Sequence, residues 1–315
     1  MSVPFRDCPW TLGRTLGLVA LLAMTPALLF ALGFVHFEIY PGISPVPPAA
    51  ELGLALERVD AVGPQGEHVA AWYLPPPRAA MAPRAPVVVI LHGLCGNRAM
   101  AVTEMKYLTQ LGYGVATVDQ RHHGDTDALP VTFGLEEAGE VTAVVDRLVA
   151  RPDVDADRIG VMGFSMGAVT ALRVACVDAR IRCVIADSPF VSLEEEAHHR
   201  IGLLTGPLEP YFYGPTLLLA RWVIGHAPAE YEVRSWLPRL GDRPLFLTVG
   251  ESDTTVSATA APRIQAARPA NTELWTVPGA GHVGARITHA AEYQRRVTAF
   301  LGRTLRARSL AGTAP

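Results

Sequence analysis

The segment GFSMG, residues 163–167, places one serine between two glycines at the point where a strand-like run meets a helix-like run. Residues 158–164 read RIGVMGF, which predicts a buried strand, and residues 165–176 read SMGAVTALRVAC, which predicts a helix. Glycine is unfavourable inside either element, so two glycines around one hydroxyl indicate a sharp backbone turn. The pattern Gly-x-Ser-x-Gly at a strand-to-helix turn is typical of a nucleophile elbow, which exposes the hydroxyl of Ser165.

The rest of the chain alternates between the same two kinds of run, after an expected hairpin over residues 57–74 with its turn at Gly63 to Gly66. Such alternation predicts an α/β fold, in which a mostly parallel twisted sheet is covered by helices on both faces. The further expected strands are 86–93, 113–119, 181–189, 244–250 and 273–279, and the expected helices are 97–112, 135–150 and 287–304.

A serine hydroxyl is a poor nucleophile at its ordinary pKa and needs a general base. Among ten histidines, His282 is the best candidate because VPGAGHVG places it in a glycine-rich loop directly after the last strand. The imidazole in turn needs an acid to orient it. FLTVGESDTTV offers Asp253, with Glu251 as the fallback, after the preceding strand. The sequence therefore predicts Ser165, Asp253 and His282 as catalytic residues, and no metal or organic cofactor.

An acyl-transfer site also needs two backbone N–H groups for the oxyanion. One is expected from Met166, immediately after the serine, and the other from Leu94 in the loop HGLCGN. His92 in that loop is expected to support the backbone and not to transfer a proton.

Two adjacent pairs, His122–His123 and His198–His199, leave metal binding open as an alternative, although neighbours on a regular element do not share a face. The four cysteines form no CxxC pair, and a Cys176–Cys183 disulfide also stays open. A net charge of −3 gives no basic surface for nucleic acid.

The N-terminal region, residues 1–39, contains 21 uncharged residues from Thr15 to Val35, enough for a helix of about 32 Å. We expect a retained membrane anchor, with a cleaved signal peptide as the alternative. Arg6 and Arg14 precede the run, so the positive-inside rule places the N-terminus in the cytoplasm and the remainder outside it. A proline-rich linker is expected at 40–56, the main domain at 57–305 and a flexible tail at 306–315.

Residues 192–239 interrupt the alternation with an apolar, aromatic stretch that is cut by prolines and glycines. We expect a small helical cap over the C-terminal edge of the sheet, where clefts of such folds lie. Phe212, Leu218 and Trp222 are its candidate substrate-binding residues. Contact of this cap with lipid remains a second interpretation.

In order and spacing, the segments ILHGLCGN, DQRHHGDT, IGVMGFSMGA, VGESDTTV and VPGAGHVG resemble the α/β-hydrolase superfamily, and most of all its membrane-anchored esterase-like members. The resemblance implies a serine hydrolase that acts on a small-molecule acyl substrate, such as an ester, through an acyl-enzyme. The same residues leave open an acyltransferase, a peptidase and a non-catalytic, membrane-tethered binding protein. They do not indicate the oligomeric state.

Overall fold

The computed structural model describes residues 9–77 and 84–305. The expectations that concern Arg6 and the tail at 306–315 lie outside these ranges.

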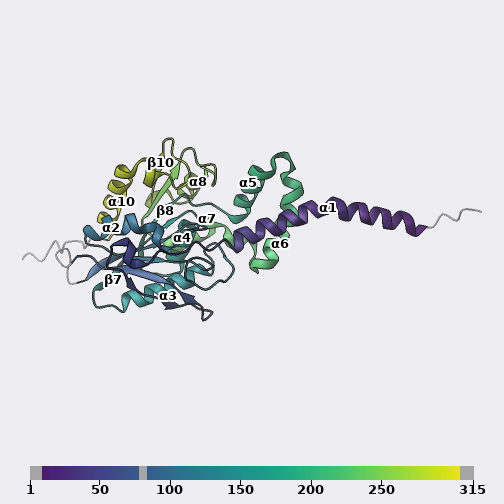
Figure 1. The fold of residues 1–315 in the computed structure, drawn as a ribbon. Helices are drawn as coiled ribbons and strands as arrows, with labels where there is room; N and C mark the ends of the chain where they lie inside the picture. Colours follow the sequence, from purple (N-terminus) through teal and green to yellow (C-terminus); the bar gives the residue numbers. More distant parts are fainter. Residues whose placement is uncertain (1–8, 78–83, 306–315) are drawn as a thin grey trace, which may run out of the picture.

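An eight-stranded sheet forms the centre of the molecule (Figure 1). The five strand pairs from β6 to β10 are parallel, whereas β4 pairs antiparallel with both β1 and β6. A separate antiparallel pair, β2 with β3, forms the expected hairpin beside β1 and β4. In sheet order the strands are β1 (Glu57–Arg58), β4 (Ala71–Leu74), β6 (Gly114–Val118), β5 (Ala85–Leu91), β7 (Val154–Phe164), β8 (Ile181–Asp187), β9 (Leu245–Gly250) and β10 (Thr272–Val277), and the hairpin joins β2 (Ala61–Val62) to β3 (His68–Val69).

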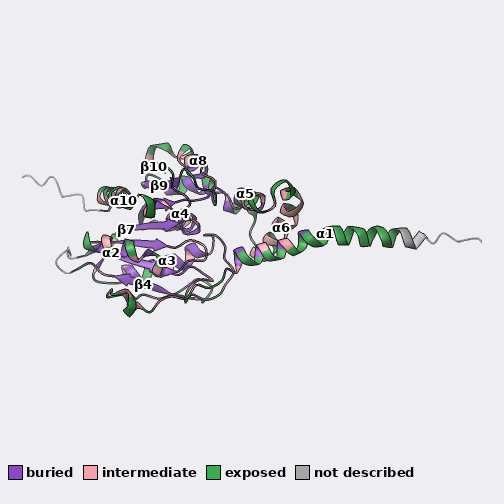
Figure 2. Cartoon of the chain, turned by 45° about the horizontal axis from the view of Figure 1, so that its top comes forward, coloured by how far each residue is buried: buried purple, intermediate pink, exposed green. Residues whose placement is uncertain are grey.

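Helices cover both faces of this sheet, as the alternation predicts. Side chains of α3 (Glu137–Val149), α4 (Met166–Val177) and α8 (Ala260–Ala267) belong to one buried apolar cluster. Side chains of α2 (Val102–Gln110), α9 (Ala285–Thr288) and α10 (Ala290–Thr304) belong to the other. The central strands are buried throughout (Figure 2) because apolar residues point to both faces, as a parallel sheet requires.

The cap is an α-helical hairpin followed by short helical turns. Its two arms, α5 (Leu193–Thr205) and α6 (Glu209–Ile224), are joined by the 3₁₀ turn η4 (Gly206–Leu208). Ser192 caps α5, because its hydroxyl accepts a hydrogen bond from the Glu195 N–H. The remaining short elements are α7 (Val233–Trp236) and the 3₁₀ turns η1 (Ala49–Leu52), η3 (Arg98–Ala101), η5 (Pro228–Tyr231), η6 (Leu237–Leu240) and η7 (Pro269–Asn271).

The apolar N-terminal run forms one continuous helix, α1 (Pro9–Ile39), which passes through Pro26. It projects from the domain, and α6 runs beside it (Figures 1 and 2). Ala27, Ala31, Val35 and Ile39 recur every four residues and are all buried, which gives α1 one packed face. The other side of α1 is exposed along most of its length.

The proline-rich segment after α1 contacts the domain. Ser44 donates a hydrogen bond to the Cys95 carbonyl at 2.8 Å, and the Asn97 amide donates to the Pro45 carbonyl at 3.2 Å. The Val131 N–H also donates to the Ile39 carbonyl at 3.0 Å. These bonds fix the exit of α1 next to the loop that contains Leu94.

Candidate active site

Three side chains that lie far apart in the sequence meet at the C-terminal edge of the sheet. Ser165 Oγ lies 2.8 Å from Nε2 of His282, and Nδ1 of the same ring lies 2.8 Å from Oδ2 of Asp253. Ser165 follows β7, Asp253 follows β9 and His282 follows β10, so parallel strands deliver all three to one edge. The structure therefore brings together the three residues predicted from the sequence.

The turn at Ser165 has the geometry of a nucleophile elbow. Ser165 has φ +53° and ψ −119°, a strained conformation for a residue with a side chain. A Cβ on Gly163 would lie 2.0 Å from the Gly167 carbonyl oxygen, and one on Gly167 would lie 2.4 Å from the His92 carbonyl oxygen. Both glycines are needed because strand, helix and the neighbouring loop pack backbone against backbone.

Asp253, and not Glu251, faces the imidazole. The second carboxylate oxygen of Asp253 accepts hydrogen bonds at 3.0 Å from the N–H groups of Thr255 and Val256. These bonds hold the buried carboxylate in one orientation. Glu251 is exposed and accepts a hydrogen bond from the Gly279 N–H, so it supports the loop that leads to His282.

The loop after β5 lies against the serine. A Cβ on Gly93 would be 3.3 Å from Cβ of Ser165, so the loop that contains Leu94 packs closely against the serine. Met166 is the first residue of α4, and a first-turn N–H has no acceptor within its own helix. The two predicted oxyanion donors therefore belong to segments that flank Ser165.

Two histidines support this loop. His92 Nδ1 lies 2.8 Å from the Gly93 carbonyl oxygen, and His92 Nε2 accepts a hydrogen bond from the Gln120 N–H. Burial, with a smaller effect of His123, lowers the pKa of His92 to about 3, so the ring is neutral. His123 Nε2 accepts from the Cys95 N–H at 3.1 Å. Sequence reasoning missed this role, and the doubled histidine of DQRHHGDT was the available signal.

The histidine loop has a second support, which sequence reasoning also missed. Ser188, directly after β8, accepts a hydrogen bond from the Val283 N–H at 3.2 Å. The neighbouring Asp187 is 1% exposed, and its backbone carbonyl accepts from the Ser165 N–H. Burial raises the pKa of the Asp187 carboxyl to about 6. One strand end thus contacts both the serine and the loop of His282.

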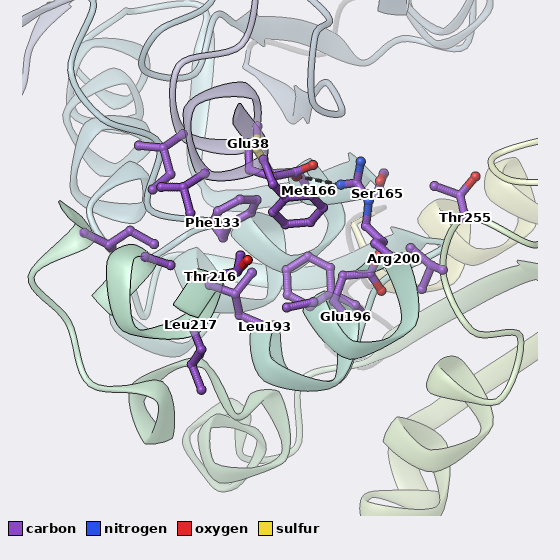
Figure 3. Close-up of a pocket in the computed structure, with 18 residues that line it drawn as sticks. Glu38, Phe133, Ser165, Met166, Leu193, Glu196, Arg200, Thr216, Leu217 and Thr255 are labelled. Carbon is purple, nitrogen blue, oxygen red and sulfur yellow. Dashed lines mark hydrogen bonds and ion pairs between the residues drawn. The ribbon is translucent and has the colours of Figure 1, made fainter. Parts of the chain in front are cut away.

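A pocket opens beside Ser165 between the elbow, the cap and α1 (Figure 3). Phe34, Val35, Glu38 and Ile39 of α1 form one wall. The other walls come mainly from α5 and α6, with Phe133 and Phe190 from the domain. Most of these side chains are apolar.

Three ionisable side chains form a cluster within these walls. Arg200 of α5 donates to the carboxylate of Glu38 at 2.6 Å, and Glu196 lies one turn earlier on α5 (Figure 3). Burial raises the pKa of Glu196 to about 8. The pocket therefore combines an apolar surface with a small polar cluster.

The three cap residues predicted to bind substrate lie outside this pocket, so the structure does not bring them to the site. Leu218 and Trp222 are 72% and 81% exposed, and Phe212 packs on Phe30 of α1 with ring centroids 4.7 Å apart. The pocket is instead lined by the α6 residues Thr216, Leu217, Ala220 and Ile224. The sequence therefore predicts the position of this helix but not which of its sides faces the pocket.

The structure also bears on the histidine metal site and the disulfide that the sequence left open. Within the described ranges, no group of three His, Cys, Asp or Glu side chains is arranged to hold a metal ion. His199 contacts the Thr254 carbonyl, and His198 contacts Glu209. Cys176 and Cys183 are free thiols, so the disulfide left open by the sequence does not form.

Comparison with known proteins identifies the family. Residues 88–295, more than half of the chain, match the family model described as the alpha/beta hydrolase family. The chain belongs to this family. The shared region runs from β5 to α10 and includes Ser165, Asp253 and His282.

Individual relatives of this alpha/beta hydrolase extend the similarity. The uncharacterized protein Rv2307c of Mycobacterium tuberculosis is 29% identical over 272 residues, covering 85% of this chain and 88% of the relative. The esterase Pf2001 of Pyrococcus furiosus has a TM-score of 0.67 and 24% identity, over 84% of this chain and 98% of the esterase. A puromycin-hydrolyzing peptidase of Mycobacterium tuberculosis has a TM-score of 0.65 and 22% identity, over 82% of this chain and 40% of the peptidase. These two structures share the fold.

Proposed function

We propose that this alpha/beta hydrolase is a serine hydrolase that cleaves carboxylic esters through an acyl-enzyme intermediate. One observation carries the proposal: the 2.8 Å contacts that link Ser165 to His282 and His282 to Asp253. A carboxylate that holds an imidazole against a serine hydroxyl is the arrangement that activates a serine nucleophile.

The reaction proceeds in two halves. Ser165 Oγ attacks the ester carbonyl carbon while its proton passes to His282 Nε2. The tetrahedral intermediate then expels the alcohol, which takes that proton, and an acyl-serine remains. Water attacks the acyl-serine, gives a proton to His282 and releases the carboxylic acid as the proton returns to Ser165. Asp253 keeps the Nδ1 proton facing it and stabilises the charged imidazole in both halves.

The Leu94 and Met166 N–H groups stabilise the oxyanion in this proposal. Their segments flank Ser165, and Met166 lies at the positive end of α4. His92 and His123 support the Leu94 loop from behind while staying out of the proton transfer. The removal of one oxyanion donor typically costs ~10²–10³ in rate.

An apolar pocket beside the nucleophile favours an acyl group as the part of the substrate that binds there. Transfer of the acyl group to an acceptor other than water, or cleavage of an amide, uses the same side chains. Product analysis with added alcohol or amine acceptors separates these reactions from hydrolysis.

We further propose that α1 is a retained membrane anchor, with the N-terminus in the cytoplasm and the catalytic domain on the other side. The helix contains one apolar segment, Gly13–Ile39, that is long enough to cross a bilayer. Only 17% of its most apolar stretch is buried against the protein, which supports contact with lipid over burial in a core.

The function is tested on the purified full chain with p-nitrophenyl esters of increasing acyl length and with a fluorophosphonate probe. We expect ester hydrolysis and a covalent adduct on Ser165, and Ser165→Ala should remove both, with a rate loss of ~10⁴–10⁶. Ser235→Ala, at an exposed serine of α7, is the matched control. Near-normal turnover by Ser165→Ala would overturn the proposal.

A further inference from the structure

The cap hairpin exposes an unusual amount of apolar side chain. Leu203, Leu204 and Leu208 near its tip and Leu218 and Trp222 on α6 are each at least 60% exposed. The second arm, α6, runs beside α1, which is itself exposed along most of its length (Figure 2). Soluble proteins rarely expose so many large apolar side chains on one structural element, so the hairpin indicates a binding surface.

The charge distribution along the hairpin indicates what covers this surface. Between Arg200 and Arg221 the chain has one charged residue, Glu209. The Glu209 carboxylate lies 2.7 Å from Nδ1 of His198, so this carboxylate is paired with an imidazole. The exposed Arg221 and Trp222 follow, near the end of α6 closest to the domain. An apolar tip followed by arginine and tryptophan is the pattern of a segment that enters a bilayer and reaches its interface.

The contact with α1 sets the depth of the hairpin. A hydrocarbon core of about 30 Å requires about 20 helical residues. A span of about 20 residues within residues 13–39 can start anywhere from 13 to 20 and end anywhere from 32 to 39. Residues 20–32 therefore belong to every possible span. Tyr211 donates a hydrogen bond to the Ala23 carbonyl, and Phe212 contacts Phe30. The beginning of α6 therefore lies at hydrocarbon depth in every register in which α1 crosses the bilayer.

The same arrangement connects the bilayer to the nucleophile. The pocket beside Ser165 has the end of α1 as one wall and α5 and α6 as others. An acyl chain that enters this pocket from the side of α1 and the cap contacts mainly apolar side chains while its carbonyl lies at Ser165. The polar cluster of Glu38, Arg200 and Glu196 lies at this end, where the polar part of a lipid would arrive.

We infer that the α5–α6 hairpin is embedded in the bilayer beside α1 and admits a membrane-resident ester lipid to the pocket. The substrate class rests on the proposed function, whereas the position of the hairpin does not. Hydrolysis then follows the two halves given above, with release of a fatty acid and an alcohol.

The position is tested by fluorescence quenching in phosphatidylcholine vesicles that contain the full chain. Brominated lipids quench tryptophan on contact, and Trp222→Phe isolates the contribution of Trp222 from that of the other tryptophans. We expect lipids brominated near the head group to quench wild type more strongly than Trp222→Phe. Trp275→Phe is the control, because Trp275 lies on β10, covered by Arg296. In the Trp222→Phe background, the fluorescence of a tryptophan introduced by Leu204→Trp should be quenched by lipids brominated near the end of the acyl chain.

Equal quenching of wild type and Trp222→Phe would overturn the bilayer position. If cross-linking between copies then involves α6, a second copy of the chain covers the surface instead.

The substrate class is tested with two esters, a water-soluble short-chain p-nitrophenyl ester and a long-chain diacylglycerol in the vesicles. Leu204→Glu places a charge at the tip of α5, outside the pocket. We expect it to lower hydrolysis of the embedded ester at least tenfold while the soluble ester changes less than twofold. Val62→Glu, at an equally exposed apolar residue of β2, is the matched control.

Unchanged hydrolysis of the embedded ester by Leu204→Glu would overturn access from the bilayer and leave the esterase function intact. An equal loss of activity on both esters would also overturn access from the bilayer, because the substitution would then impair the catalytic step and not the entry of lipid. If wild type hydrolyses neither ester, the proposed function fails, and the quenching experiment still decides the position of the hairpin.

Discussion

The exchange Asp253→Asn tests the proposed proton relay most directly, because the structure fixes how the new amide must lie. In wild type, Oδ1 accepts two backbone hydrogen bonds, from Thr255 and Val256, while Oδ2 faces Nδ1 of His282. An asparagine keeps its oxygen on the two N–H donors, so its NH₂ group must face the imidazole. Nδ1 then has to accept this bond, and the ring proton moves to Nε2.

A proton on Nε2 removes the acceptor that Ser165 needs. We therefore expect kcat/KM for a p-nitrophenyl ester to fall by about 10⁴, which corresponds to about 5.5 kcal/mol of transition-state stabilisation. Thermal stability should change little, because both backbone hydrogen bonds are retained. The rate of labelling by a fluorophosphonate should fall in parallel, since that reaction needs the same activated hydroxyl.

The control is Glu251→Gln in the same loop, which should stay within about twofold of wild type because the Glu251 carboxylate accepts from the Gly279 N–H and does not hold the imidazole. A loss of less than tenfold in Asp253→Asn, or a larger loss in Glu251→Gln, would refute the assignment of the acid.

Two further predictions concern the elbow and the strand end behind it. Gly163→Ala should destabilise the chain by at least about 3 kcal/mol in denaturant unfolding, because its Cβ would lie 2.0 Å from the Gly167 carbonyl oxygen. The control, Gly302→Ala, has open space around it in α10 and should stabilise the chain by about 0.5–1 kcal/mol. Equal effects of the two substitutions would contradict the packing argument. Asp187 has its pKa raised to about 6 by burial, so its contribution to stability is present below about pH 4 and is lost as the pH rises through about 6. That shift corresponds to about 3 kcal/mol, so the melting temperature of Asp187→Asn relative to wild type should rise between pH 4 and 7, and a constant difference would contradict it.

The sheet and the elbow were predictable from the sequence because local rules determine them. Apolar runs separated by helical segments specify a parallel sheet, and only glycine fits where Gly163 and Gly167 contact backbone. The three proposed catalytic side chains follow from the same rule, since each lies just after a parallel strand. The hydrogen bonds by which His123 and Ser188 support the two loops were not predicted, because a hydrogen bond between two loops leaves no periodic pattern in the sequence.

The cap shows where local rules stop. Pocket residues Leu217 and Ala220 and exposed residues Leu218 and Trp222 belong to one helix that is apolar on all sides, so hydrophobic periodicity cannot specify its rotation. In a soluble domain the polar side of a helix identifies its buried side. On α6 that distinction is missing because both sides meet apolar surroundings, the pocket on one side and, in our inference, lipid on the other.

The same packing bears on the choice between an anchor and a signal peptide. Cleavage at the small residues Ala31 to Gly33 would remove Ala23 and Phe30, which contact Tyr211 and Phe212 of α6. It would expose the inner side of α6 in addition to Leu218 and Trp222, and a helix that is apolar all round would then lie in water. It would also leave Phe34, the first α1 residue of the pocket wall, at the new N-terminus. A pocket that uses the end of α1 as a wall therefore favours a chain that keeps the whole helix, and hence a hydrolase whose site stays at the membrane.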